Sequence, residues 1–274
     1  CALPICRDRG AARRGRLLPP LGFRPSRHGS GAHLGRLTVH HADFVAGAAA
    51  ARGVAIVIDV FRACSLIAHA LAAGAARVLP VEGVEEARAR KAAHPDWLLV
   101  GERHARPLPG FDCGNSPTEA LRRPLAGRTL IHTTHAGTQG LVAASRSASR
   151  VFTGAFVNAA ATVAAVRALQ PDEVTIVAMG HEACERCVED DLCRDLLQAR
   201  LLGGSFDTDG LVPRLRRAPA AAKFFDPAAD WAPEDDFAHC AALDVVPFAV
   251  ALGRSPEGWP ELRPCPTVGA PEAA

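Results

Sequence analysis

The stretch Val54-Ala55-Ile56-Val57-Ile58-Asp59-Val60 decides the fold of this chain. It is short, almost continuously apolar and rich in β-branched side chains, a pattern typical of a strand that is buried on both faces. The Ala-rich segment 63–74 follows it with helical character, and Gly74 stands where the end of a helix favours a residue of positive φ. The sequence therefore predicts a strand followed by a helix, the repeating unit of α/β proteins.

The same alternation continues along the chain. We expect strands at 77–81, 97–100, 129–134, 151–156 and 173–179, and helices at 84–93, 137–145, 159–169 and 188–202. Beyond residue 203 the pattern weakens to a helix near 236–243 and a strand at 245–250, and the segment 102–117 is expected to be a long loop. This alternation predicts an α/β fold, a three-layer α/β/α sandwich whose sheet is mainly parallel or mixed.

The charges are unevenly distributed. The 274 residues carry 31 Lys and Arg against 29 Asp and Glu, a net charge of +2. Residues 1–36 hold eight arginines and one acid, which leaves the remainder negative. We therefore predict an Arg/Pro/Gly-rich leader without stable structure at 1–36, an α/β domain at 37–255 and a Pro-rich tail at 256–274. Nucleic acid is not an expected partner of the acidic domain, so polyanion binding would fall to the leader, whose composition also fits a transit peptide or a solvated tail.

Several other classes of protein are disfavoured. No apolar run approaches the roughly 18 residues of a membrane-spanning helix. Nine cysteines, an odd number, without a secretory signal predict reduced thiols and a cytoplasmic protein. Neither a Walker loop nor a GxGxxG motif supports ATP or NAD as a ligand. Cys184, Cys187, Cys193 and His181 offer an alternative zinc site, but no second CxxC completes its usual pattern.

Polar residues follow the ends of several predicted strands. Asp59 ends the first strand, Thr133 and Thr134 end the fourth, and Glu189 and Asp190 open the helix after the sixth. Each type also has an ordinary role as a helix cap, a turn residue or an acid at a helix N-terminus. Because the carboxyl ends of parallel strands meet at one edge, their convergence there favours a ligand site.

The residue types at this edge suit a small phosphorylated acid. Thr138 and the backbone opened by Gly137 would form a cradle for an anion. Arg62 and Arg103 are suited to phosphate or sulfonate. Carboxylates such as Asp59 and Asp190 are the oxygen ligands that Mg²⁺ prefers.

The chain also resembles a known family, the 2-phosphosulfolactate phosphatases, from about residue 37 to 250. The matching segments are Val57-Ile58-Asp59-Val60-Phe61-Arg62-Ala63, Gly101-Glu102-Arg103, Gly110-Phe111-Asp112-Cys113-Gly114-Asn115-Ser116-Pro117, Thr133-Thr134-His135-Ala136-Gly137-Thr138, the helix start at Asn158, Glu189-Asp190-Asp191-Leu192-Cys193, Phe237-Ala238-His239-Cys240 and Asp244-Val245-Val246-Pro247. The resemblance implies an α/β sandwich and Mg²⁺-dependent hydrolysis of the phosphoester of a small acidic substrate. That substrate would be 2-phosphosulfolactate, an intermediate of coenzyme M biosynthesis, or a related phosphorylated 2-hydroxy acid.

Two segments depart from the family pattern. Cys64 and Ser65 stand where members usually have two threonines, and Ala136-Gly137-Thr138 matches a bacterial branch with a TxAGT motif. The resemblance therefore supports phosphatase activity for this chain more strongly than it supports a particular substrate.

The resemblance assigns roles to residues of this sequence. Asp59, Arg62 and Asp190 would be catalytic, with Mg²⁺ held by Asp59 and by Glu189 or Asp190, while water or a carboxylate attacks phosphorus. Substrate would be bound by Ser65, Arg103, Asn115, Ser116, Thr133, Thr134, Gly137, Thr138 and Asn158. A non-catalytic binding protein for small phosphorylated or sulfonated acids is the alternative, and assembly into a homo-oligomer stays open.

Overall fold

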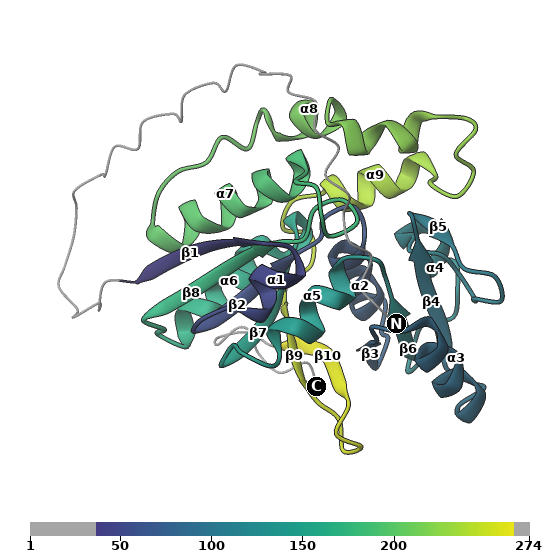
Figure 1. Cartoon of the computed structure of the whole chain (residues 1–274). Coiled ribbons are helices and arrows are strands. Elements are labelled where there is room, and N and C mark those ends of the chain that lie inside the picture. Colours follow the sequence, from purple (N-terminus) through teal and green to yellow (C-terminus); the bar gives the residue numbers. More distant parts are fainter. Residues whose placement is uncertain (1–36, 266–274) are drawn as a thin grey trace. The chain divides into compact units, whose positions relative to one another are not determined.

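A computed structural model describes residues 37–265 (Figure 1), so the predicted leader at 1–36 lies outside the described residues. The α/β fold is confirmed: the described residues form a large mixed, mostly parallel sheet with helices packed against it. The strands are β1 Thr38–Asp43, β2 Val54–Ile58, β3 Arg77–Pro80, β4 Leu98–Arg103, β5 Arg106–Pro107, β6 Thr129–Thr133, β7 Arg150–Gly154, β8 Glu173–Ala178, β9 Ala249–Arg254 and β10 Pro260–Cys265. The helices are α1 Phe44–Ala49, α2 Ala63–Ala72, α3 Val84–Ala93, α4 Pro117–Leu121, α5 Gly137–Ala144, α6 Ala159–Ala168, α7 Val188–Leu202, α8 Leu211–Arg216 and α9 Glu234–Ala241, with 3₁₀ helices η1 Phe156–Asn158 and η2 Pro219–Phe225.

The sheet consists of two parallel blocks joined by a hairpin. Its order is β1-β8-β2-β7-β9-β10-β3-β6-β4-β5. Strands β1, β8, β2 and β7 are mutually parallel, as are β3, β6 and β4, while β9 and β10 pair antiparallel with each other and with their neighbours. The blocks therefore run formally in opposite directions. Residues that follow strands of both blocks nevertheless line the same cleft, as Asp59 after β2 and His135 after β6 do.

Alternate residues of β2 enter two different hydrophobic clusters. Ala55 and Val57 pack in the cluster that contains α2 and α5, whereas Val54, Ile56 and Ile58 pack in the cluster that contains α6 and α7. Both faces of β2 are thus covered by apolar side chains, which explains why its sequence is an apolar run without polar alternation.

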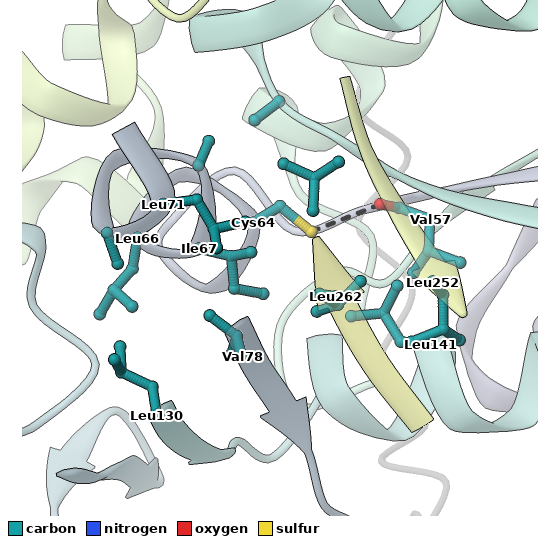
Figure 2. Close-up of a cluster of buried hydrophobic side chains, with 14 of the residues drawn as sticks. Val57, Cys64, Leu66, Ile67, Leu71, Val78, Leu130, Leu141, Leu252 and Leu262 are labelled. Atoms are coloured by element: carbon teal, nitrogen blue, oxygen red, sulfur yellow. Dashed lines mark hydrogen bonds between the residues drawn. The ribbon is translucent and has the colours of Figure 1, made fainter. Parts of the chain in front are cut away.

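Helix α2 ties the two blocks together (Figure 2). Its apolar side chains lie in one cluster with Val57 of β2 and with Val78 and Leu130 of the second block. Leu252 and Leu262 of the hairpin complete the same cluster, and Cys64 Sγ donates to the Val57 carbonyl at 3.4 Å. Cys64 is therefore a small core residue of α2.

The structure differs from the sequence prediction at the edges of the pattern. Strand β1 and helix α1 were not predicted, because β1 is a half-exposed edge strand without an apolar run. Strand β10 lies within the predicted Pro-rich tail, and Leu262 is its only fully buried large apolar residue. The last predicted strand begins four residues later, at Ala249. Within residues 37–265, no helix is both long enough and apolar enough to cross a membrane.

Candidate active site

A polar cleft lies where the carboxyl ends of strands from both blocks meet the start of α7. Four buried acids line it, together with two basic side chains and polar residues of three loops. The acids are Asp59, Glu102, Glu189 and Asp190, and the basic residues are Arg62 and Lys223; Asn115, His135, His181, Glu182 and Cys187 are also part of the lining. The predicted convergence of acids at one edge of the sheet is thus present in the structure.

Asp59 is held at the end of β2 by the start of α2. Its Oδ1 accepts the backbone N–H of Ala63 at 3.1 Å, and the side chain is 9% exposed. Burial raises the pKa of Asp59 from 3.8 to about 6, and the charge of Glu102 adds to this effect, while the hydrogen bond from Ala63 opposes it. Asp59 is therefore a carboxyl group that titrates close to neutral pH.

Asp190 and Glu189 come from the first turn of α7 and are engaged differently. The two carboxylate oxygens of Asp190 accept the backbone N–H groups of Val60 and Gly180, at 2.9 and 2.8 Å, which joins the loops after β2 and β8. Glu189 Oε2 is buried and has no hydrogen-bond partner among the described residues. Burial raises the pKa of both groups, and the charges of Asp59 and Glu189 raise that of Asp190 further.

Glu102 and Lys223 belong to the cleft although the sequence did not single them out as site residues. Glu102 accepts the backbone N–H groups of Ala105 and His135, at 2.7 and 2.6 Å, and so fixes two loops. Lys223 extends from η2, and burial lowers its pKa, whereas the charges of Glu189 and Asp59 raise it. Lys223 is one of only two lysines in a chain whose other basic residues are arginines, which is the signal that could have identified it.

Arg62 lines the cleft but is also part of the core. Its guanidinium donates to Asp236 at 2.8 Å and to the carbonyls of Trp231 and Ala105 at 3.1 and 3.0 Å. These contacts engage three of its five N–H donors. Arg62 therefore fixes α9 and the β4–β5 turn around the cleft and keeps further donors for a ligand.

Asn115 reaches the cleft from the loop before α4. Its Oδ1 lies 3.1 Å from Nε2 of His132, which is buried in β6. Burial and the charge of Arg103 lower the pKa of His132 to about 3, so the imidazole is neutral at physiological pH and donates to Asn115. This contact leaves the amide N–H₂ group of Asn115 available as a donor.

The remaining predicted substrate-binding residues do not line the cleft. Ser65 Oγ donates to the carbonyl of Val60, and Ser116 caps α4 and donates to Asp236. Thr134 and Thr138 bond to each other across the start of α5. Thr133 accepts from Arg103, which also donates to the carbonyl oxygens of Glu102 and Glu82, and the amide of Asn158 lies 3.4 Å from the Phe248 carbonyl. Their contacts position loops and helices around the cleft.

Gly137 holds the second block against Asp59. A Cβ atom at this position would lie 2.6 Å from Asp59 Oδ2 and 2.8 Å from Ala63 Cβ, closer than side chains approach. We expect Gly137→Ala to lower the free energy of unfolding by about 1–3 kcal/mol, the usual cost of overpacking a tight site. Gly253→Ala is the matched control, because nothing lies within 4 Å of its Cβ position. Equal urea-unfolding midpoints for the two variants would show that the close approach is not needed.

The acids fit a divalent cation by their chemistry. Buried carboxylates that raise one another's pKa values, one of them with an unpartnered oxygen, are suited to a hard cation such as Mg²⁺. Within residues 37–265, however, the one group of three ligand atoms that lie within 4.8 Å of one another is His104, His135 and Glu182. The acid cluster would therefore supply only part of a coordination shell, as is usual for Mg²⁺, which keeps several waters.

The alternative zinc site at the CxxC segment is not assembled among the described residues. Cys193 is fully buried in the cluster beneath α7, whereas Cys187 borders the cleft and Cys184 is exposed. These thiols and His181 do not form a ligand group in this part of the chain. The pKa of Cys187 is raised by burial and by the nearby acids, which disfavours a thiolate.

Comparison with known proteins gives one consistent result. The family model described as 2-phosphosulpholactate phosphatase matches residues 40–218. Curated relatives named "Probable 2-phosphosulfolactate phosphatase" are 41% identical over 129 residues in Deinococcus radiodurans, 38% over 143 in Caldicellulosiruptor saccharolyticus and 34% over 178 in Thermotoga maritima. These alignments cover 47%, 51% and 63% of this chain and 54%, 58% and 69% of the relatives. The chain thus matches little more than half the length of the first two.

Proposed function

This chain belongs to the 2-phosphosulpholactate phosphatase family, and from that premise we propose that it is a Mg²⁺-dependent phosphatase of a small acidic substrate. The substrate class is 2-phosphosulfolactate or a related phosphorylated 2-hydroxy acid. The observation that carries the proposal is the cluster of Asp59, Glu189 and Asp190 in one cleft with Arg62 and Lys223. Phosphoryl transfer requires a cation site beside hydrogen-bond donors for the phosphate oxygens. The acids of this cleft would supply the first, and the basic side chains the second.

The acid cluster supports the cation site. Asp59 and Glu189 would hold Mg²⁺, and Asp190, whose oxygens already accept two backbone N–H groups, would orient the loops that carry the site and complete the ligand set. When bound, Mg²⁺ supplies positive charge that stabilises the charge developing on the phosphoryl oxygens.

The basic side chains and Asn115 support binding of the anionic substrate. Lys223 lies beside Glu189 and Asp59, and the unengaged N–H donors of Arg62 border the same cleft. The amide of Asn115, oriented by His132, adds a neutral donor. Together these groups would hold phosphate oxygens and the acid end of the substrate by charge-assisted hydrogen bonds.

Asp59 is an acid of the cleft whose protonation state changes near neutral pH. With a pKa of about 6 it is mainly ionised above that pH, and it then serves as a cation ligand, a proton acceptor or a nucleophile toward phosphorus. Its position at the end of a central strand, locked by Ala63 and Gly137, gives any of these roles a fixed geometry.

The proposal is tested by phosphate release from a panel of substrates. We expect Mg²⁺-dependent release from 2-phosphosulfolactate and from phosphorylated 2-hydroxy acids, loss of release with EDTA, and slower release from p-nitrophenyl phosphate, which lacks the second acidic group. Calorimetric titration with a sulfonated, non-hydrolysable analogue distinguishes a phosphatase from the alternative, a non-catalytic binding protein. Tight binding without turnover of any panel member would make the chain a binding protein and overturn the phosphatase proposal.

A further inference from the structure

Three turns at the mouth of the cleft bring two imidazoles and a carboxylate together. His104 lies in the turn between β4 and β5, His135 in the turn between β6 and α5, and Glu182 in the turn after β8. One ligand atom of each residue lies within 4.8 Å of the other two. The fold thus converges three separate connections on one point, from both blocks of the sheet.

Two of the three side chains contact each other, and the third has a ring nitrogen without a hydrogen-bond partner among the described residues. His104 Nδ1 lies 2.6 Å from Glu182 Oε1, and the ring centroids of His104 and His135 are 4.9 Å apart. His135 Nδ1 is buried without a hydrogen-bond partner among residues 37–265. A neutral imidazole nitrogen without such a partner can donate its lone pair to a metal ion.

The backbone holds the ligands in an uncommon conformation. His104 and Glu182 have φ values of 53° and 50°, and the residues after them, Ala105 and Ala183, also have positive φ. Non-glycine residues adopt this left-handed region infrequently, and such positions cluster at functional sites. In both turns, therefore, the ligand residue and the residue after it adopt the left-handed backbone conformation.

We propose that His104, His135 and Glu182 form a binding site for a divalent first-row transition metal ion, such as Zn²⁺ or Co²⁺. Two neutral imidazoles and one carboxylate are a common donor set for such ions, whereas Mg²⁺ prefers oxygen ligands alone. His135 and Glu182 also line the cleft, so an ion held by these residues would be accessible from it. This site uses none of the residues of the acid cluster at Asp59, Glu189 and Asp190, and it does not depend on the proposed phosphatase activity.

The proposal is tested by metal binding to the full, tag-free chain. In excess Mg²⁺, which saturates sites made only of oxygen ligands, we expect Co²⁺ to bind in a one-to-one ratio and to develop visible absorption. Zn²⁺ is expected to displace it. His104→Ala and Glu182→Gln are each expected to weaken binding at least tenfold, since even the loss of an outer-shell partner weakens metal sites by about 10–100-fold.

Three control variants separate this site from other sources of binding. His40→Ala removes a histidine that also lies near a glutamate, with its Nε2 3.4 Å from Glu173 Oε1. Among residues 37–265 it belongs to no three-ligand group, so Co²⁺ affinity is expected to stay unchanged. Glu189→Gln is expected to leave Co²⁺ affinity unchanged as well, even where it alters phosphate release. The double variant Cys184→Ser with Cys187→Ser is expected to retain the visible bands. Co²⁺ binding that survives His104→Ala, or that disappears with the cysteines, would overturn the proposal.

Discussion

Asp59→Asn is expected to abolish Mg²⁺-dependent phosphate release and, at the same time, to stabilise the metal-free fold. Loss of release follows because the amide carries no charge for the cation and cannot accept a proton or attack phosphorus at neutral pH. The fold is preserved because the amide oxygen can still accept the N–H of Ala63. Asp59 is buried beside Glu102 and Asp190, so removing its charge relieves both desolvation and repulsion.

The gain in stability depends on pH with a definite sign. The pKa of Asp59 is about 6 in the folded protein against 3.8 ordinarily, so between these values the folded state binds more protons than the unfolded state. The stability of the parent chain therefore falls as pH rises through this window, and the penalty is complete above pH 6. At neutral pH, ionisation of Asp59 lowers the free energy of unfolding by at most about 3 kcal/mol, so Asp59→Asn can gain up to this amount. This gain in stability should vanish below about pH 4.

Urea unfolding in EDTA at several pH values measures this effect. Asp112→Asn is a control for which a change in stability of opposite sign is expected. Burial raises the pKa of Asp112, but the hydrogen bond from Leu99 and the charge of Lys91 outweigh burial and lower it overall. Its neutralisation is expected to destabilise the fold at neutral pH. Near-normal phosphate release by Asp59→Asn would remove Asp59 from its proposed role, and a loss of stability at pH 7 would contradict the raised pKa of Asp59.

Asp236→Ala is expected to be the most destabilising single substitution around the cleft, with a loss of about 3–5 kcal/mol. Asp236 is fully buried and pairs with Arg62, and its other oxygen accepts from Ser116 Oγ and the backbone N–H of Thr118. The substitution leaves the Arg62 guanidinium buried without its counter-ion. Domains are typically stable by only about 5–15 kcal/mol, so the loss should be evident in urea unfolding.

Two further variants make this expectation specific. Asp235→Ala changes the neighbouring, exposed acid and is expected to be nearly neutral. Asp236→Asn retains an acceptor for Ser116 and Thr118 and is expected to lose less than Asp236→Ala. Equal stability of Asp235→Ala and Asp236→Ala would show that the Arg62–Asp236 pair does not hold α9 in place.

The central elements could be predicted from the sequence because burial on two faces leaves a plain apolar run. Strand β2 and helices such as α3 and α7 lie within a few residues of their predicted bounds. Strands β1 and β10 carry too few apolar residues to be recognised, since they are stabilised by pairing with neighbouring strands. Pairing with strands that are distant in the sequence leaves no hydrophobic periodicity within β1 or β10 from which they could be predicted.

The site was predicted unevenly for similar reasons. Asp59 was found because it directly follows a strong strand, and Glu189 and Asp190 because they lie in the first turn of a strong helix. Side chains alternate along a strand, so Arg103 and Glu102 point to opposite faces, and the prediction chose Arg103 for its charge. Buried hydroxyls such as those of Ser65 and Thr134 look like ligand groups in sequence, but in the structure they bond to the protein itself.

The hairpin of β9 and β10 has a consequence for how the protein is made. Both parallel blocks are complete in sequence by residue 178, but the strands that join them are the last in the described chain. On the ribosome, we therefore expect β7 and β3 to lack their neighbours β9 and β10, and to remain open edges, until residues 249–265 emerge. Such edges are templates for pairing with other chains, so the period before residues 249–265 emerge is when chaperone binding would protect this protein most.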